Sequence, residues 1–414
     1  MSHLQVIVVG GGAAGFFAAI TCAEACSQAE VSLLERGSHF LGKVKISGGG
    51  RCNVTNVCND PRELSRHYPR GGDALLGPFH SFRTQDTMNW FESRGVRLKA
   101  ESDGRVFPVT DSSSTVIQCL TSAAQNAGVN LLPNHTVSEI RRNSGKRFSL
   151  QLANGKDMIC DCLMLATGGC RAAANGQLAV SFGHTLEPPV PSLFTFHIRL
   201  PWLRALAGIS VPKIEISLPG LGLRELGPLL ITHEGLSGPA VLRLSAWGAR
   251  ELHAMDYNFP LQVNWVPTLD TAELAASLDR CRAKQPAKRI VNGPAVPLPA
   301  RLWEALVLAA GIPEEMRWAE LPRNSRHRLL EQLSDSQFHA CGRSLNQEEF
   351  VTCGGVRLKE INFKTMESRI VPGLYFGGEL LDIDGVTGGF NFQAAWTTGW
   401  IAGNAMAAAA GHAL

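Results

Sequence analysis

The stretch Gln5–Gly37, QVIVVGGGAAGFFAAITCAEACSQAEVSLLERG, decides the fold that this sequence predicts. Residues 6–9 form a short β-branched run without a polar interruption, as expected of a strand buried on both faces of a parallel sheet. Residues 16–26 are rich in Ala and lack Gly and Pro, which predicts a helix. A second strand is expected at residues 31–34. The pattern therefore predicts a strand, a helix and a second strand in succession.

Three glycines join the first strand to the helix in the spacing Gly-x-Gly-x-x-Gly. Gly10 would permit the tight turn, Gly12 would let a pyrophosphate approach the backbone, and Gly15 would let the helix pack closely on the strand. Glu35 follows at the end of the second strand, about twenty residues on, where an acid can bind ribose hydroxyls. Glycines alone can arise in a structural turn, but this whole order predicts a dinucleotide site.

Composition favours a soluble, cytoplasmic protein. Of the 414 residues, 45% are hydrophobic and 18% are charged, which is typical of globular chains of two or three domains. No segment approaches the roughly 20 apolar residues of a membrane span. The first apolar run leads into the glycine turn, so we expect no signal peptide. The net charge of +3 neither requires nor excludes an anionic partner.

The 11 cysteines are scattered and form no Cys-x-x-Cys pair. Their spacing supports neither a zinc ribbon nor the redox disulfide of thioredoxin-reductase-like flavoproteins. In a reducing cytosol such cysteines mostly fill the core as small apolar side chains. We therefore predict no metal site.

A second Gly-rich segment, Leu41–Asn56 (LGKVKISGGGRCNVTN), is expected to form another wall of the nucleotide site. Gly42 and its neighbours expose successive backbone N–H groups, which make an anion-binding concavity, and Lys43 and Arg51 add positive charge. Asn53 belongs to a polar cluster that is unusual for a mobile surface loop, which is the alternative.

Later segments are expected to approach the same ligand. The strand predicted at residues 158–165 leads into Thr167 and Gly168, at an edge where open α/β sheets bind ligands. Val137, at a strand edge, could bind an adenine ring through its backbone. Arg105 lies in a compact turn that we expect near the ligand.

The C-terminal part is predicted to return to this domain. A strand at residues 374–376 is followed by Gly378, where side chains are again absent at a strand end. Asp382 is placed to bind a ribityl chain. The helix that follows Gly389 would direct its positive N-terminus at the site, which suits a negatively charged reduced flavin.

Between these parts, prolines and short strands predict an inserted antiparallel β module, followed by helices. The predicted fold class is α/β, with a three-layer, Rossmann-like domain around a parallel sheet that the insertions interrupt. The expected domains are 1–187 and 347–414 for the nucleotide-binding domain, 188–270 for a β-rich substrate domain, and 271–346 for a small helical subdomain.

The helical subdomain carries two basic clusters, at residues 280–289 and 323–328. Their members are Arg280, Arg282, Lys284, Lys288 and Arg289, then Arg323, Arg326, His327 and Arg328. A solvated helix face is the default explanation, and a docking surface for nucleic acid is the alternative.

Several motifs together resemble the BaiN/YhiN-type flavoproteins of the FAD-binding superfamily that includes fumarate reductase flavoproteins. The matching segments are VIVVGGGAAG, LERG, GKVKISGGGRCNVTN, GRVFP, ATGG, THEGLSGPAVL, VTCGGVRLKEINFKTMESRIVPGLYFGGELLDIDG and GGFNFQAAWTTGWIAG. One segment departs from the family pattern, because Cys170–Gly176 is short and Ala-rich. The resemblance implies non-covalent FAD, with contacts at Gly12, Ala14, Glu35, Arg36, Lys43, Asn53, Val137, Gly168, Glu379, Asp382 and Asn391.

The resemblance also implies a chemistry. Members of the family have been linked to reduction of a uridine of large-subunit ribosomal RNA to dihydrouridine, and others to reduction of activated C=C bonds. In both, flavin delivers hydride to the β-carbon of an enone-like system and a protein acid protonates the neighbouring carbon. His233 is the first candidate acid, because histidines ordinarily titrate near pH 6.5, and a structural hydrogen bond is the alternative for it. Cys353 is the second candidate, and a small residue packed under the flavin is the alternative for it. Arg51 and Arg105 could polarise a substrate carbonyl.

Three functions remain open at this point. The first is an FAD-dependent reductase of a ribosomal RNA uridine, and the second is a reductase or dehydrogenase of a small unsaturated metabolite. The third is an FAD-stabilised RNA-binding or assembly factor without a redox role. Because the sequence holds no second Gly-x-Gly-x-x-Gly unit, NAD(P)H as the electron donor would bind only transiently, in the substrate cleft, or another reductant would replace it.

Overall fold

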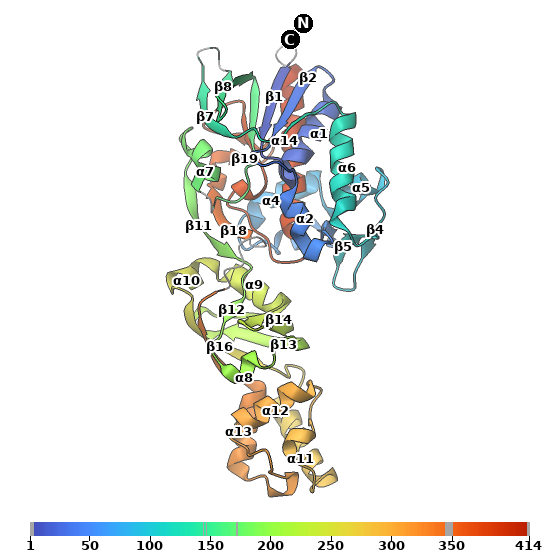
Figure 1. The fold of residues 1–414 in the computed structure, drawn as a ribbon, viewed down its shortest axis with the longest axis vertical. Helices are drawn as coiled ribbons and strands as arrows, with labels where there is room; N and C mark the ends of the chain where they lie inside the picture. Colours follow the sequence, from blue (N-terminus) through green and yellow to red (C-terminus); the bar gives the residue numbers. More distant parts are fainter. Residues whose placement is uncertain (1–3, 144, 146, 171–172, 344–350, 412–414) are drawn as a thin grey trace. The chain divides into compact units, whose positions relative to one another are not determined.

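The computed structural model describes residues 4–143, 145, 147–170, 173–343 and 351–411. The chain divides into two compact units, one made of residues 1–191 and 347–414 and the other of residues 192–346 (Figure 1). The first unit is therefore built from both ends of the chain. Within the described residues, no helix is long and apolar enough to cross a membrane.

The first unit is organised around a seven-stranded sheet in the order β19-β20-β21-β10-β1-β2-β6. The strands are β1 Leu4–Val9, β2 Ala29–Leu34, β6 Asn130–Leu132, β10 Cys162–Leu165, β19 Ile361–Asn362, β20 Glu367–Ser368 and β21 Leu374–Phe376. From β21 to β6 all neighbours are parallel. Central β1 is buried over its last residues, as its β-branched run predicts.

The helices of this unit are α1 Ala13–Ala25, α2 Gly42–Ile46, α3 Pro61–Ser65, α4 Gly72–Ser81, α5 Thr84–Glu92, α6 Ser113–Asn126, α7 Ala173–Val180 and α14 Phe390–Gly411. The first and last of them cross closely. A Cβ added at Gly399 would lie 2.5 Å from the carbonyl oxygen of Ala14, and one at Gly403 would lie 2.6 Å from that of Ala18. Glycines on α14 therefore let the C-terminal helix pack directly on the helix of the glycine turn.

Three smaller sheets complete this unit. They are β3-β5-β4 (Thr55–Asn56, Arg105–Pro108, Leu98–Ala100), β7-β8-β9 (Val137–Arg142, Phe148–Leu152, Asp157–Cys160) and β11-β18 (Leu186–Ser192, Val351–Val356). The single strand predicted at residues 158–165 is in fact two, β9 and β10, in different sheets. Asp161 separates them, because its carboxylate accepts a hydrogen bond from the N–H of Gln5 (2.9 Å) and pairs with Arg147 (2.8 Å).

The second unit contains an antiparallel sheet in the order β12-β15-β14-β13-β16-β17. Its strands are β12 Phe196–His197, β13 Ser210–Leu218, β14 Leu223–Ile231, β15 Gly235–Ser237, β16 Asn258–Asn264 and β17 Ser336–Cys341, and its helices are α8 Pro201–Arg204, α9 Pro239–Trp247, α10 Ala249–Ala254, α11 Thr271–Lys284, α12 Ala300–Ala309 and α13 Arg323–Ser334. Only helices were predicted over 271–346, yet β17 lies there and pairs with residues 258–263 of β16. Its side chains alternate between buried and exposed, which is the period of a strand.

Candidate functional site

In the glycine turn between β1 and α1, the fold requires glycine at two positions but not at the third. Gly10 has φ +115°, and a Cβ there would lie 2.2 Å from the carbonyl oxygen of Ala166. A Cβ at Gly15 would lie 2.0 Å from the carbonyl oxygen of Gly10. Gly12 has an ordinary φ of −91°, and a Cβ there would meet no atom within 4 Å. Bare backbone at Gly12 thus leaves space at the start of α1, where a phosphate binds in dinucleotide folds.

Glu35 lies beside this turn. Its carboxylate accepts hydrogen bonds from the N–H groups of Gly11 (3.0 Å) and Gly37 (2.8 Å), which fix it at the end of β2. A carboxylate has about four acceptor positions, so the oxygens keep capacity for ribose hydroxyls. The structure places Glu35 where the spacing predicts a ribose-binding acid.

Asn175, which the sequence analysis did not identify, organises the end of β10. Its amide donates to the carbonyl oxygen of Gly169 (2.9 Å), and its own carbonyl accepts from the hydroxyl of Thr167 (2.8 Å). Its side-chain oxygen accepts from Arg36 (3.0 Å). Between these residues Gly168 has φ +78°, a conformation that favours glycine. No spacing signal marks Asn175, because its role depends on which loops meet there.

Glu379 and Lys43 form an ion pair of 2.5 Å, although they are 336 residues apart in the sequence. The other carboxylate oxygen of Glu379 accepts from the N–H of Thr352 (2.9 Å). Gly378, next to Glu379, has φ +68°, and a Cβ there would lie 2.9 Å from that of Ala14. The structure therefore brings predicted residues of α2, the glycine turn and the C-terminal segment together.

The first turn of α14 is held by the second Gly-rich segment. Gly389 has φ +92°, and a Cβ there would lie 2.4 Å from the carbonyl oxygen of Thr55. The Asn53 amide, oriented by its partners, accepts from the N–H of Gly389 (2.8 Å) and donates to the Thr55 carbonyl (2.9 Å). Asn56 donates to the carbonyl oxygen of Gly388 (3.0 Å). The segment that was predicted to wall the site thus positions the N-terminus of α14.

The loop before α14 is fixed from within. The side-chain amide of Asn391 makes two hydrogen bonds to the backbone of Gly385: it accepts one from the N–H (2.9 Å) and donates one to the carbonyl oxygen (2.8 Å). Asp382 is 9% exposed. Asp384 is fully buried and pairs with Arg70, whose Nε donates to it at 2.6 Å. The loop is therefore a rigid element rather than a mobile turn.

Gln393, a second residue that the sequence analysis missed, ties three elements together inside the core. Its side-chain oxygen accepts from the hydroxyls of Thr55 (2.6 Å) and Thr87 (2.9 Å), and its nitrogen donates to the hydroxyl of Thr397 (3.0 Å). The side chain is fully buried. It anchors α14 to β3 and α5.

Replacing Gln393 by Leu is expected to lower the free energy of unfolding by about 2–3 kcal/mol, because buried hydroxyls would lose their acceptor. Urea unfolding of the purified protein measures this. Gln177→Leu, at an exposed position, is the control and should change stability by less than about 0.5 kcal/mol. Equal effects of the two substitutions would contradict the anchoring role.

The predicted catalytic residues occupy distinct environments. Arg51 and Arg105 both pair with Glu101, at 2.7 and 2.8 Å, so their charge is compensated. Cys353 is fully buried in β18, whereas His233 is exposed between β14 and β15. Cys353 and His233 belong to different units. Roles for these side chains in catalysis stay predictions.

Neighbouring thiols are not suited to act as nucleophiles. Burial raises the pKa of Cys52 to about 12, and the pKa of Cys170 to about 11. Both are therefore neutral thiols near pH 7. Among the residues that the structure describes, no group of three or more His, Cys, Asp or Glu side chains could hold a metal ion.

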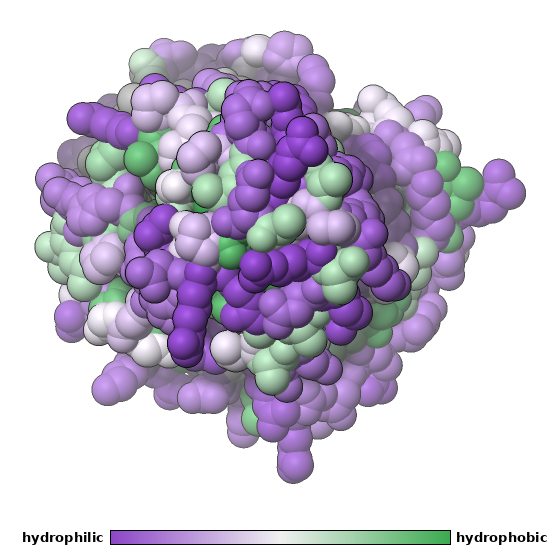
Figure 2. Space-filling view, turned by 90° about the horizontal axis from the view of Figure 1, so that it is seen from below, coloured by the Kyte–Doolittle hydropathy of each residue, from purple (hydrophilic) through white to green (hydrophobic). Residues whose placement is uncertain are grey.

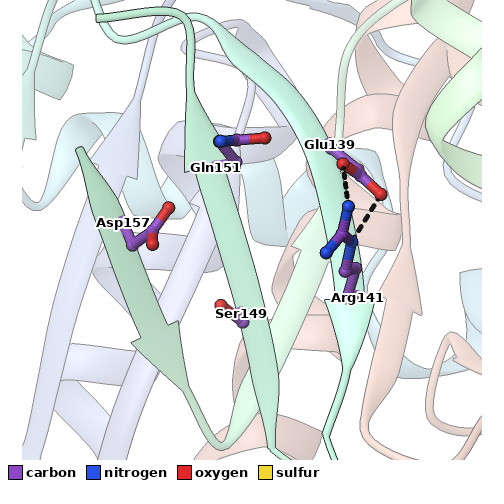
Figure 3. A pocket seen from close by; sticks show the side chains of 5 residues that line it. All are labelled: Glu139, Arg141, Ser149, Gln151 and Asp157. Atoms are coloured by element: carbon purple, nitrogen blue, oxygen red, sulfur yellow. Dashed lines mark hydrogen bonds and ion pairs between the residues drawn. The ribbon is translucent and has the colours of Figure 1, made fainter. Parts of the chain in front are cut away.

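One pocket lies on the sheet β7-β8-β9 (Figure 3). It is lined by Glu139, Arg141, Ser149, Gln151 and Asp157, and the ion pair between Arg141 and Glu139 (2.6 Å) spans one side of it. Val137 begins β7 but does not line this pocket. The pocket contains no predicted catalytic residue.

The parallel sheet, the open backbone at Gly12 and the convergence of both chain ends fit an adenine dinucleotide and define the class as an FAD-dependent oxidoreductase with a Rossmann-type fold. The family model described as the HI0933-like protein Rossmann domain matches residues 4–405, and the chain belongs to this family. The BaiN/YhiN-type resemblance and the predicted fold class are thereby confirmed.

Relatives match over nearly the whole chain. The ribosomal RNA dihydrouridine synthase of Escherichia coli is 32% identical over 97% of this chain and 97% of its own. The 3-dehydro-bile acid delta(4,6)-reductase of Clostridium scindens is 29% identical over 97% of this chain and 99% of its own. A solved structure, the 3-ketosteroid delta1-dehydrogenase of Sterolibacterium denitrificans, has a TM-score of 0.52 at 13% identity and covers 99% of this chain and 100% of its own. That likeness shows a shared fold.

Proposed function

We propose that this FAD-dependent oxidoreductase reduces an activated C=C bond, and that its substrate is a uridine of large-subunit ribosomal RNA, which becomes dihydrouridine. The observation that carries the substrate is the near full-length identity to proteins named ribosomal RNA dihydrouridine synthase, 32% in Escherichia coli and 31% in Haemophilus influenzae. These matches cover 97% and 96% of the chain.

The described geometry supports the cofactor positions in this proposal. When bound, FAD supplies the hydride for reduction of the double bond. Gly12 and the start of α1 would accept the pyrophosphate, and Glu35 the ribose of the adenosine. Asn53 and Gly389 hold the N-terminus of α14, whose positive end would favour a reduced flavin. The further contacts proposed are Gly10, Ala14, Gly15, Arg36, Gly42, Lys43, Val137, Thr167, Gly168, Gly378, Glu379, Asp382 and Asn391.

The proton donor and the electron source are also proposals. A donor must reach the carbon next to the one that receives hydride, so an accessible side chain is favoured. His233 is exposed and Cys353 is fully buried, which favours His233. NAD(P)H is the proposed reductant, bound transiently.

Deleting the gene is expected to remove one dihydrouridine from large-subunit ribosomal RNA, as measured by mass spectrometry of nuclease digests. The natural protein should restore the modification, and His233→Asn should restore much less of it. His327→Asn, at an exposed histidine of α13, is the matched control and should restore it fully. A digest that is unchanged by the deletion would remove the ribosomal RNA substrate from consideration.

The second candidate is reduction of a small unsaturated metabolite, which the bile acid reductase relative favours. It predicts that a free enone reoxidises the chemically reduced enzyme under argon, as followed by flavin absorbance. No reoxidation across a panel of cyclic enones, together with loss of dihydrouridine on deletion, would decide for the RNA substrate. Membership of an oxidoreductase family argues against the third alternative, a factor without redox chemistry.

A further inference from the structure

Most cations in the helical part of the second unit have no carboxylate partner, although three of them do. Its ion pairs are Arg289 with Glu315 (2.5 Å), Arg326 with Asp279 (2.8 Å) and His327 with Glu331 (3.3 Å). Among the described residues, the following cations of this part have no ion-pair partner within 4.0 Å: Arg280, Arg282, Lys284, Lys288, Arg317, Arg323 and Arg328. The structure thus revises the predicted clusters, because Arg289, Arg326 and His327 each lie within ion-pair distance of a carboxylate and Arg317 is added.

Several of these guanidinium groups are held in place by neutral acceptors. Arg282 donates to the carbonyl oxygen of Ala319 (3.1 Å), Arg317 to that of Ala287 (3.2 Å) and Arg328 to that of Ala310 (2.8 Å). A carbonyl fixes a guanidinium without cancelling its charge. Because each guanidinium has five N–H donors, others remain available for an anion.

Contacts of this kind pack the elements that carry these cations against one another. Arg326 makes two hydrogen bonds to Asp279, at 3.0 and 2.8 Å, and so connects α13 to α11. The bond from Arg282 connects α11 to the short 3₁₀ helix Trp318–Glu320. We call the cations given above that have no ion-pair partner, taken together, the basic surface.

Two acids of this part are engaged with backbone N–H groups. Glu273 caps the first turn of α11 through Asp270, at the end opposite Arg282 and Lys284, and Glu320 accepts from the backbone N–H of Arg317 (3.2 Å). Several cations of the first unit are instead held by carboxylates. Examples are Arg51, Arg66, Arg94, Lys99, Arg105, Arg141, Arg147 and Arg357.

The chemistry of the basic surface indicates its partner. Trp303 and Trp318 are fully buried, and Leu308 is the large hydrophobic side chain of this part that is exposed, at 44%. The face shown in Figure 2 is mostly hydrophilic, with hydrophobic side chains in small separate areas. Lys and Arg side chains contact phosphates, whereas binding of single-stranded bases commonly uses exposed aromatic rings.

We propose that the basic surface binds the phosphodiester backbone of a folded RNA and so presents the substrate RNA to the enzyme. This inference rests on the proposed function, because it takes ribosomal RNA as the partner. The side chains of Lys284, Lys288 and Arg323 are exposed and make no hydrogen bond within the described residues, so truncating them should not disturb the fold.

The test compares the triple substitution K284A/K288A/R323A with the charge-matched triple R66A/K99A/R141A, whose cations are paired with acids. Binding of each FAD-loaded protein to protein-free large-subunit ribosomal RNA, isolated from the deletion strain, is measured from 50 to 300 mM KCl. The first triple should bind on the order of 10-fold more weakly at 100 mM, and its slope of log affinity against log salt should fall by about 2–3. The control triple should bind within about 2-fold of the natural protein.

Unchanged affinity and slope in the first triple would overturn the proposal, as would equal weakening of both triples. Visible absorbance of bound FAD verifies that each variant is folded. The dihydrouridine content of the deletion strain reports separately on the proposed function. If dihydrouridine persists in the deletion strain but the triple substitution weakens RNA binding, the RNA-binding role of the basic surface is supported and the proposed substrate is refuted. If deletion removes dihydrouridine but the triple substitution does not change RNA affinity, only the proposal for the basic surface is refuted.

Discussion

Gly12→Asp is expected to abolish FAD binding and leave the protein folded. The backbone there is extended, with φ −91° and ψ −168°, which any L-residue adopts, and an added Cβ meets no atom within 4 Å. Gly12 is also the N-cap of α1, where Asp is a favourable residue. The carboxylate would occupy and repel the pyrophosphate. FAD affinity should fall on the order of 100-fold or more, equivalent to about 2.8 kcal/mol.

The measurement is visible absorbance of the purified protein together with FAD titration of the apoprotein. Gly15→Ala is the informative counterpart, because its methyl group would lie 2.0 Å from the carbonyl oxygen of Gly10. It should lower stability by about 3 kcal/mol, since overpacking forces the backbone to shift. Full flavin occupancy in Gly12→Asp would refute the assignment of the glycine turn to the cofactor.

Arg70→Ala is expected to destabilise the protein by about 3–5 kcal/mol, because it leaves a buried carboxylate without its cation. Asp384 is fully buried, and the Arg70 side chain is 12% exposed. Urea unfolding measures the change. The pair also fixes the loop before α14, so the variant should lose FAD on dilution.

Arg66→Ala serves as the control for this substitution. The Arg66–Glu63 pair has a comparable distance of 2.6 Å, but its side chains are 72% and 57% exposed. Its removal should cost less than about 1 kcal/mol, because exposed ion pairs contribute little. The double substitution Arg70→Met/Asp384→Leu should recover part of the loss. If Arg70→Ala cost no more than Arg66→Ala, the buried pair would not be what stabilises this loop.

Local sequence patterns were sufficient to predict the structure wherever the residues of one short segment alone determine its conformation. The β-branched run of β1, the Ala-rich helix α1 and the glycines between them follow from backbone conformation and burial alone. The division of residues 158–165 into β9 and β10 was not predictable in this way. Both halves favour extended backbone, and only the contacts of Asp161 with Gln5 and Arg147 separate them.

The sequence by itself determined the glycine turn, the acid after β2, the order of the nucleotide-binding elements and the family. Each of these features depends on residues that lie within about 35 positions of one another, so the spacing of those residues in the sequence is enough to recognise it. Only the tertiary structure decided that Lys43 meets Glu379 and that Asn53 and Gln393 hold the start of α14. The partners of such side chains lie up to 338 residues away. Their hydrogen bonds exist because the chain returns to its first sheet after an insertion, and no local pattern encodes where a returning segment will lie.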